Sequence, residues 1–121
     1  MKKRFLLMFV APLTAIGSFA EGKYVVVDGL KFFVRTDTKE AILFANSYKG
    51  DITVPDTITD EDMKYTVTAF ADGCFKSCSG LTSVSIPSTV TSLGKECFYD
   101  CSGLKTISIP SSVTSLGESC F

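Results

Sequence analysis

Two copies of one sequence unit occupy residues 67–89, VTAFADGCFKSCSGLTSVSIPST, and residues 90–112, VTSLGKECFYDCSGLKTISIPSS. Aligned without gaps, the two stretches share 12 identities in 23 positions. Residues 113–121, VTSLGESCF, begin a third copy that matches residues 90–98 at seven of nine positions. Tandem copies at a fixed short period are typical of solenoids, in which equivalent residues of successive coils stack. The sequence therefore predicts a mainly β solenoid with 23-residue coils.

Each copy contains one predicted strand. In Leu81-x-x-Val84-x-Ile86, and again at residues 104–109, apolar residues alternate with Ser85 or its equivalent, so Val84 and Ile86 are expected to point inward. Pro87 lacks an amide hydrogen and should end the strand. Gly80 and Gly103 are expected to turn the chain into each strand.

The cadence Cys-Phe-x-x-Cys-Ser-Gly-Leu, followed by Ile-Pro-Ser-x-Val-Thr-Ser-Leu-Gly, closely resembles the BspA-type leucine-rich repeats. This resemblance implies a leucine-rich-repeat solenoid and a surface protein of the kind found in host-associated bacteria and some parasitic protists. Thr89 and Ser112 stand where commoner leucine-rich repeats carry a ladder of Asn, and their hydroxyls are expected to bond a backbone group. Such proteins carry many copies, so we expect this chain to be a truncated product or a fragment of a longer one.

Residues 21–66 are predicted to form a β-rich amino-terminal cap segment, a short antiparallel β lead-in to the repeats at 67–89, 90–112 and, in part, 113–121. Asp28-Gly29 lies between two runs of β-forming residues and predicts a hairpin. Residues 52–55, Ile-Thr-Val-Pro, resemble the Val-Ser-Ile-Pro of residues 84–87 at an offset of 32. A degenerate repeat is therefore expected within the cap segment.

Residues 1–20 have the form of a secretory signal peptide. Lys2, Lys3 and Arg4 precede an apolar run that reaches about residue 16, and Ser18-Phe19-Ala20 suits cleavage after Ala20. A membrane-spanning helix needs about 20 apolar residues, and this run is shorter and interrupted. Cleavage removes three of the 12 basic and none of the 13 acidic residues, leaving a net charge of −4. We expect a secreted or cell-surface protein with no membrane span in the mature chain and no nucleic-acid partner.

Five cysteines follow the repeat: Cys74, Cys78, Cys97, Cys101 and Cys120. The 23-residue period explains every spacing among them, so we expect buried thiols that pack like small apolar residues in two ladders. Disulfides between neighbouring coils and a metal site are the alternatives left open.

No catalytic function is expected. The absence of His removes the usual general base and the His-containing triads, and no Gly-x-Ser-x-Gly or glycine-rich phosphate loop occurs. The acidic tripeptide at residues 60–62, with Asp51 and Asp56, supplies carboxylates of the kind that a glycosidase or calcium site uses, but a solvated loop is the simpler interpretation. No cofactor or metal is predicted.

The function that remains is binding. Solenoid strands laid side by side form an extended face, and the residues expected on its exposed side are Thr82, Ser83, Ser85, Lys105, Thr106 and Ser108. The family resemblance implies adhesion to host or matrix proteins or to other cells. The alternative is a structural spacer fragment of a longer repeat surface protein. An edge left open at the third copy is expected to favour edge-to-edge self-association.

Overall fold

The computed structural model describes residues 22–121, which form strands and turns without a helix, while the predicted signal peptide lies outside the described residues. The strands are β1 (Gly22–Val27), β2 (Leu30–Arg35), β3 (Glu40–Leu43), β4 (Gly50–Thr53), β5 (Thr57–Asp60), β6 (Met63–Phe70), β7 (Leu81–Ser85), β8 (Ser92–Leu93) and β9 (Ser115–Leu116). Within the described part, no helix is long and apolar enough to cross a membrane.

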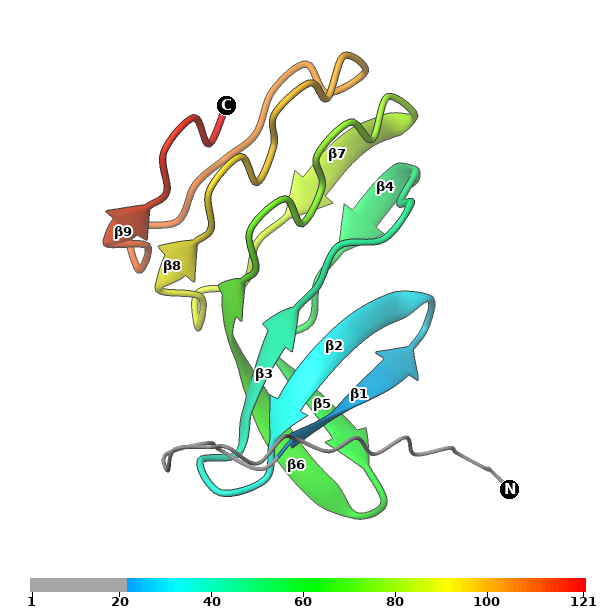
Figure 1. The fold of residues 1–121 in the computed structure, drawn as a ribbon, viewed down its shortest axis with the longest axis vertical. Helices are drawn as coiled ribbons and strands as arrows, with labels where there is room; N and C mark the ends of the chain where they lie inside the picture. Colours follow the sequence, from blue (N-terminus) through cyan, green and yellow to red (C-terminus); the bar gives the residue numbers. More distant parts are fainter. Residues whose placement is uncertain (1–21) are drawn as a thin grey trace, which may run out of the picture.

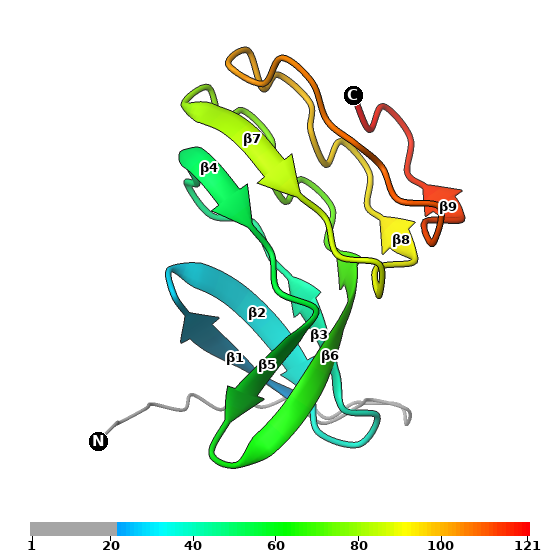
Figure 2. The ribbon, with the colours of Figure 1, turned by 180° about the vertical axis from the view of Figure 1, so that it is seen from behind.

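Two sheets divide these strands. The larger has the order β1-β2-β3-β6-β8-β9, with β5 paired to β6, and the smaller consists of β4 and β7 (Figure 1). Strand β3 pairs with β6 in parallel, as do β6 with β8, β8 with β9 and β4 with β7. Figures 1 and 2 show β8 and β9 on one flank and β4 and β7 on the opposite flank, with the chain crossing between them.

The predicted hairpin at Asp28-Gly29 is confirmed. Strand β1 pairs with β2 in antiparallel register, with Val27 opposite Leu30. Asp28 and Gly29 have φ values of 51° and 82°, the left-handed pair that a two-residue hairpin turn requires.

The prediction that residues 21–66 form an antiparallel β lead-in is wrong in part. It holds for β1–β2–β3 and for β5–β6, but β3 pairs with β6 in parallel. Strand β4 leaves this segment altogether and pairs with β7, which places Ile52 opposite Val84. Strands β3 and β4 thus already follow the path of the repeats, because parallel neighbours require the chain to return through a crossover.

Backbone hydrogen bonds join residues one repeat apart. The amide of Thr91 donates to the carbonyl of Thr68, and the amide of Thr114 donates to Thr91, both at 2.9 Å. The rings of Phe75, Phe98 and Phe121 stack in sequence, with centroids 5.3 and 5.5 Å apart and planes within 8° and 7° of parallel. The coils therefore stack through their backbone and through a column of equivalent rings.

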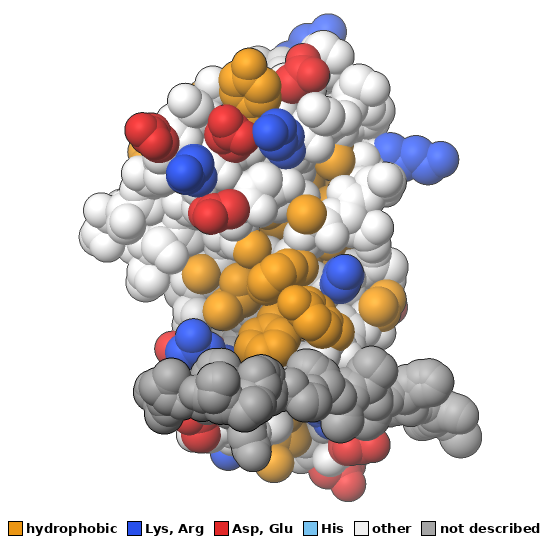
Figure 3. Space-filling view, viewed as in Figure 1, with side chains coloured by type: hydrophobic (Ala, Val, Ile, Leu, Met, Phe, Trp, Pro, Cys, Tyr) orange, Lys and Arg blue, Asp and Glu red, His pale blue; other side chains and the backbone are white. Residues whose placement is uncertain are grey.

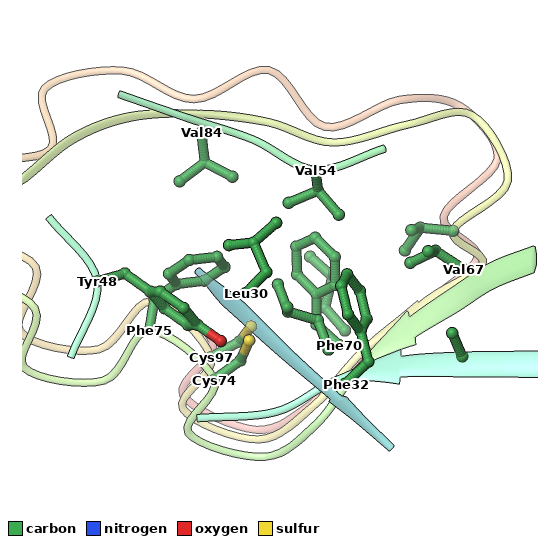
Figure 4. Packing of buried hydrophobic residues seen from close by; sticks show 14 of the residues in the cluster. Leu30, Phe32, Tyr48, Val54, Val67, Phe70, Cys74, Phe75, Val84 and Cys97 are labelled. Atoms are coloured by element: carbon green, nitrogen blue, oxygen red, sulfur yellow. The ribbon is translucent and has the colours of Figure 1, made fainter. Parts of the chain in front are cut away.

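The cysteines pack in the core as expected. Cys74, Cys78, Cys97 and Cys120 are buried and Cys101 is half-buried, and all five are free thiols. Figure 4 shows the sulfurs of Cys74 and Cys97 side by side next to Phe75 and Tyr48. Burial raises the pKa of the Cys74 thiol well above its usual range, so that thiol remains protonated.

Gly80 and Gly103 matter because they have no side chain, not because their backbone adopts a conformation that only glycine favours. Gly80 and Gly103 lie in the expected turns, but the residues with positive φ there are Ser77 (59°) and Asp100 (61°). A Cβ on Gly103 would lie 2.6 Å from the carbonyl oxygen of Ser79 in the preceding coil. Glycine at this position therefore permits close approach of two coils.

The two hydroxyls at the positions of the asparagine ladder, those of Thr89 and Ser112, differ in their hydrogen bonding. The Ser112 hydroxyl donates to the carbonyl oxygen of Val90 at 2.7 Å, as expected. The buried hydroxyl oxygen of Thr89 has no hydrogen-bond partner among the described residues, so the expectation fails at this position.

Candidate functional site

The candidate site is the exposed side of β4, β7 and residues 104–109, which we call the strand face. Buried and exposed side chains alternate only in part along β7: Leu81 and Val84 are buried, whereas Thr82, Ser83 and Ser85 are all exposed. The cause is a register shift between Gly50 and Asp51 in the β4–β7 pair. Thr82 is the extra residue, which turns its side chain outward together with that of Ser83.

This shift directs two hydroxyls at one carboxylate. Thr82 Oγ1 and Ser83 Oγ donate to the same oxygen of Asp51, at 2.7 and 2.9 Å. These two hydrogen bonds lower the pKa of the Asp51 carboxyl, because they favour its charged form. The strand face therefore carries a fixed negative charge at this point.

One repeat further along, Lys105, Thr106 and Ser108 are also exposed. They occupy the positions equivalent to Thr82, Ser83 and Ser85, but residues 104–109 are not a regular strand and contact no partner that fixes these side chains. The structure thus brings Thr82 and Ser83 together around Asp51, while the three residues of the next copy stand separately.

Two residues of the strand face were missed by the sequence analysis. Asp51 and Thr53 on β4 are exposed and lie opposite Ser83 and Ser85. The sequence resemblance between residues 52–55 and 84–87 has an offset of 32 residues, and the same offset relates Asp51 to Ser83 and Thr53 to Ser85. The signal was present, although a resemblance over four residues does not by itself show strand pairing.

The acidic tripeptide is more structured than a solvated loop. Glu61 and Asp62 form the tight turn between β5 and β6, with φ values of 51° and 69°. Asp60 is buried and forms an ion pair with Lys23 of β1, at 2.9 Å from Nζ to Oδ2. This pair raises the pKa of Lys23 and ties the two hairpins together. Residues 22–121 contain no group of three His, Cys, Asp or Glu side chains placed to hold a metal ion.

A second exposed surface was not foreseen. Tyr24, Phe33 and Phe44 meet on the outer side of β1, β2 and the end of β3, with ring centroids 5.1 to 6.2 Å apart. The ammonium of Lys31 lies 5.1 Å from the centre of the Tyr24 ring. Figure 3 shows hydrophobic side chains gathered on the middle of this side of the molecule, with charged side chains of both signs above them.

The parallel stacks and the column of equivalent rings are consistent with a repeat protein of the solenoid class. The sequence matches the family described as BspA type leucine rich repeat region (6 copies) over residues 42–121. The chain belongs to the BspA-type leucine-rich-repeat family, which confirms the resemblance read from the repeats.

Solved structures of bacterial proteins share this fold. A leucine rich cell surface protein from Faecalibacterium prausnitzii is 30% identical with a TM-score of 0.68, over 78% of this chain and 26% of that one. A leucine-rich repeat protein from Bacteroides ovatus is 29% identical with a TM-score of 0.65, over 74% of this chain and 24% of that one. This chain thus spans about a quarter of each protein's length.

A leucine-rich repeat protein from Bacteroides capillosus has a TM-score of 0.70 at 24% identity, over 78% of this chain and 71% of that one. At that identity it supports the fold alone. No curated protein matches the sequence.

Proposed function

We propose that this chain is a secreted or cell-surface protein that binds other proteins, on host tissue, in extracellular matrix or on other cells, through the strand face. The observation that carries the proposal is the exposure of all six predicted residues along one flank, with Asp51 fixed among them by two hydroxyls. The description of the Faecalibacterium prausnitzii protein as a cell surface protein supports the location.

The chemistry of the strand face suits a protein ligand. Hydroxyls on neighbouring strands recur about every 4.8 Å and can both donate to and accept from an extended backbone. Asp51 and Lys105 add one charge of each sign, which favours a mixed protein surface over a polyanion. The net charge of −4 expected after signal cleavage disfavours nucleic acid in the same way.

We also propose that the repeats form a solenoid of 23-residue coils behind a β lead-in that begins at β1. Supporting this, Ala69 pairs with Ser92 and Ser92 with Ser115, each 23 residues along the chain. Export would be through residues 1–20. Mass spectrometry of the exported protein should then give an amino terminus at residue 21, and an intact Met1 would refute export by this signal.

The binding proposal is tested on a panel of purified matrix proteins, collagen, laminin and fibronectin, and on host-cell surfaces. Ser85 and Thr106 are exposed and have no hydrogen bond to lose, so Ser85→Glu with Thr106→Glu changes the strand face alone. The matched control is Thr114→Glu with Ser115→Glu, two exposed residues without a side-chain hydrogen bond, which adds the same charge at β9. We expect at least a tenfold loss of binding for the first pair and little change for the second.

Equal losses in both pairs would refute the strand face as the binding site. If the unaltered protein binds neither the panel nor the cells, the binding proposal is wrong and a spacer role becomes the better interpretation.

A further inference from the structure

Strand β1 has one open backbone edge. It is the first strand of the larger sheet, and β2 is its one partner among the described strands (Figure 2). The amide of Lys31 donates to the Tyr48 hydroxyl and its carbonyl accepts from the amide of Phe44, so both groups point away from β1. Val26, opposite Lys31, therefore directs its own amide and carbonyl away from β2, and by alternation Tyr24 does the same. None of these four groups forms a hydrogen bond within the described chain.

The side chains beside these open groups are apolar. Val26 is 68% exposed and Tyr24 is 44% exposed, both on the outer side of the sheet. The Tyr24 ring packs edge-on against Phe33 and Phe44, which holds it in place. Exposed apolar side chains next to unpaired main-chain groups are the arrangement to which a further strand adds, because such a strand gains hydrogen bonds and apolar contact together.

The charge at this edge indicates which strand fits. On the outer side, the ammonium of Lys31 lies 5.1 Å from the centre of the Tyr24 ring and forms no ion pair within the described chain. On the inner side, the ammonium of Lys23 is already held by Asp60 at 2.9 Å and by Glu61 at 3.4 Å. The ammonium that is available to a ligand at β1 is therefore the one on the outer side, and it favours an acidic side chain there.

We propose that the open edge of β1 binds an extended peptide of a partner protein, which adds as an antiparallel strand with apolar and acidic side chains on its outer side. The peptide main chain pairs with the open groups of Tyr24 and Val26, an apolar side chain covers Val26, and an acidic side chain beside Tyr24 contacts the Lys31 ammonium. A second copy of β1 fits this edge less well, because a two-fold pair places both Lys31 ammoniums on one face. This site shares no residue with the strand face.

The test uses the chain from residue 21 and the fluorescent peptide Thr-Glu-Thr-Val-Thr-Val-Thr, followed by anisotropy at low salt. A second peptide has Lys in place of Glu. A third carries N-methyl groups on the Glu and Val amides, which face β1 in antiparallel pairing, and a fourth carries them on the Thr amides, which face away. We expect the first and fourth peptides to bind alike, the second to bind several-fold more weakly, and the third at least tenfold more weakly. No saturable binding of the first peptide, or equal binding of the third and fourth, overturns the proposal.

Protein variants locate the site. Lys31→Glu should reverse the preference, so that the Lys peptide binds better than the Glu peptide. Tyr24→Ala should weaken binding of the first peptide several-fold. Tyr99→Ala is the matched control, because Tyr99 is 46% exposed and has the Lys76 ammonium 5.7 Å from its ring centre, but belongs to the repeats. Equal losses for Tyr24→Ala and Tyr99→Ala, or an unchanged charge preference in Lys31→Glu, overturn the assignment.

The backbone of the edge is tested by Val26→Pro. This variant removes an amide that faces the open edge and leaves the β1–β2 hydrogen bonds in place, a position at which edge strands accept proline. Binding of the first peptide should fall at least tenfold, and unchanged binding contradicts pairing at this edge. Sedimentation tests the other occupant: a dimer that Val26→Pro dissociates, together with no binding of the first peptide, assigns the edge to a second copy and overturns the proposal.

Discussion

The column of stacked rings offers the sharpest test of the repeat architecture, because one residue type occupies the same repeat position in three different environments. Phe98 lies between Phe75 and Phe121 and is 3% exposed, whereas Phe121 has a ring on one side only and is 60% exposed. Substituting each by Ala removes the same atoms from an interior coil and from the open edge.

The expected costs follow from burial. A phenylalanine side chain buries about 200 Å², and at roughly 25 cal/mol per Å² the full transfer term is about 5 kcal/mol. Phe98→Ala should therefore lower the free energy of unfolding by about 4 kcal/mol, within the range measured for buried Phe→Ala substitutions. Phe121 retains less than half of that burial, so Phe121→Ala should cost roughly 1.5 kcal/mol.

Urea unfolding followed by circular dichroism measures both values, with equal m values as the check that the transition is unchanged. A small domain has a total stability of about 5–15 kcal/mol, so at the low end of that range Phe98→Ala leaves no folded baseline. Phe98→Leu, which keeps most of the volume and should cost under about 1.5 kcal/mol, then takes its place. Costs for Phe98→Ala and Phe121→Ala that agree within 0.5 kcal/mol would refute the asymmetry between interior and edge coils.

Three further predictions concern single buried groups. Cys97→Ala should cost about 1–2 kcal/mol in urea unfolding and leave the zinc content of the purified protein unchanged; stoichiometric zinc that disappears in the variant would contradict the packing role. Thr89→Val removes a buried hydroxyl oxygen without a hydrogen-bond partner and should raise the free energy of unfolding by about 1 kcal/mol, whereas a loss would show that the hydroxyl is satisfied. Burial raises the pKa of Tyr48 to about 12, above its ordinary value of 10.0, so the unfolded chain loses this proton first and stability falls as pH rises from about 10 to 12. Tyr48→Phe, which also loses the 2.7 Å hydrogen bond to Phe44, should be less stable at pH 7 but should lose less stability over that alkaline range.

The sequence predicted best what depends on local geometry or on repetition. The Asp28-Gly29 hairpin follows from two adjacent left-handed residues, and the packing of the cysteines follows from their common period. The side chains of Thr82, Ser83 and Ser85 were placed correctly on the exposed side of β7.

What the sequence did not show depends on contacts between distant segments. Strand β3 prefers β6 as a parallel neighbour because the chain between them travels out through β4 and back, and local propensity does not report that path. The role of Asp51 arises from a register shift against β7, and the meeting of Tyr24 with Phe44 arises from strand order. Neither contact can be predicted without knowing which strands pair.

The repeat separates residues that hold the coil from residues that can vary. Between the two full copies, the inward Leu81 and Ile86 recur unchanged as Leu104 and Ile109, while the outward Thr82 becomes Lys105. Exposed substitutions of this kind usually change stability by less than about 0.5 kcal/mol, whereas loss of a buried Leu costs about 2–5 kcal/mol. The strand face can therefore acquire a new charge pattern at a stability cost several-fold smaller than that of losing one of the buried Leu side chains.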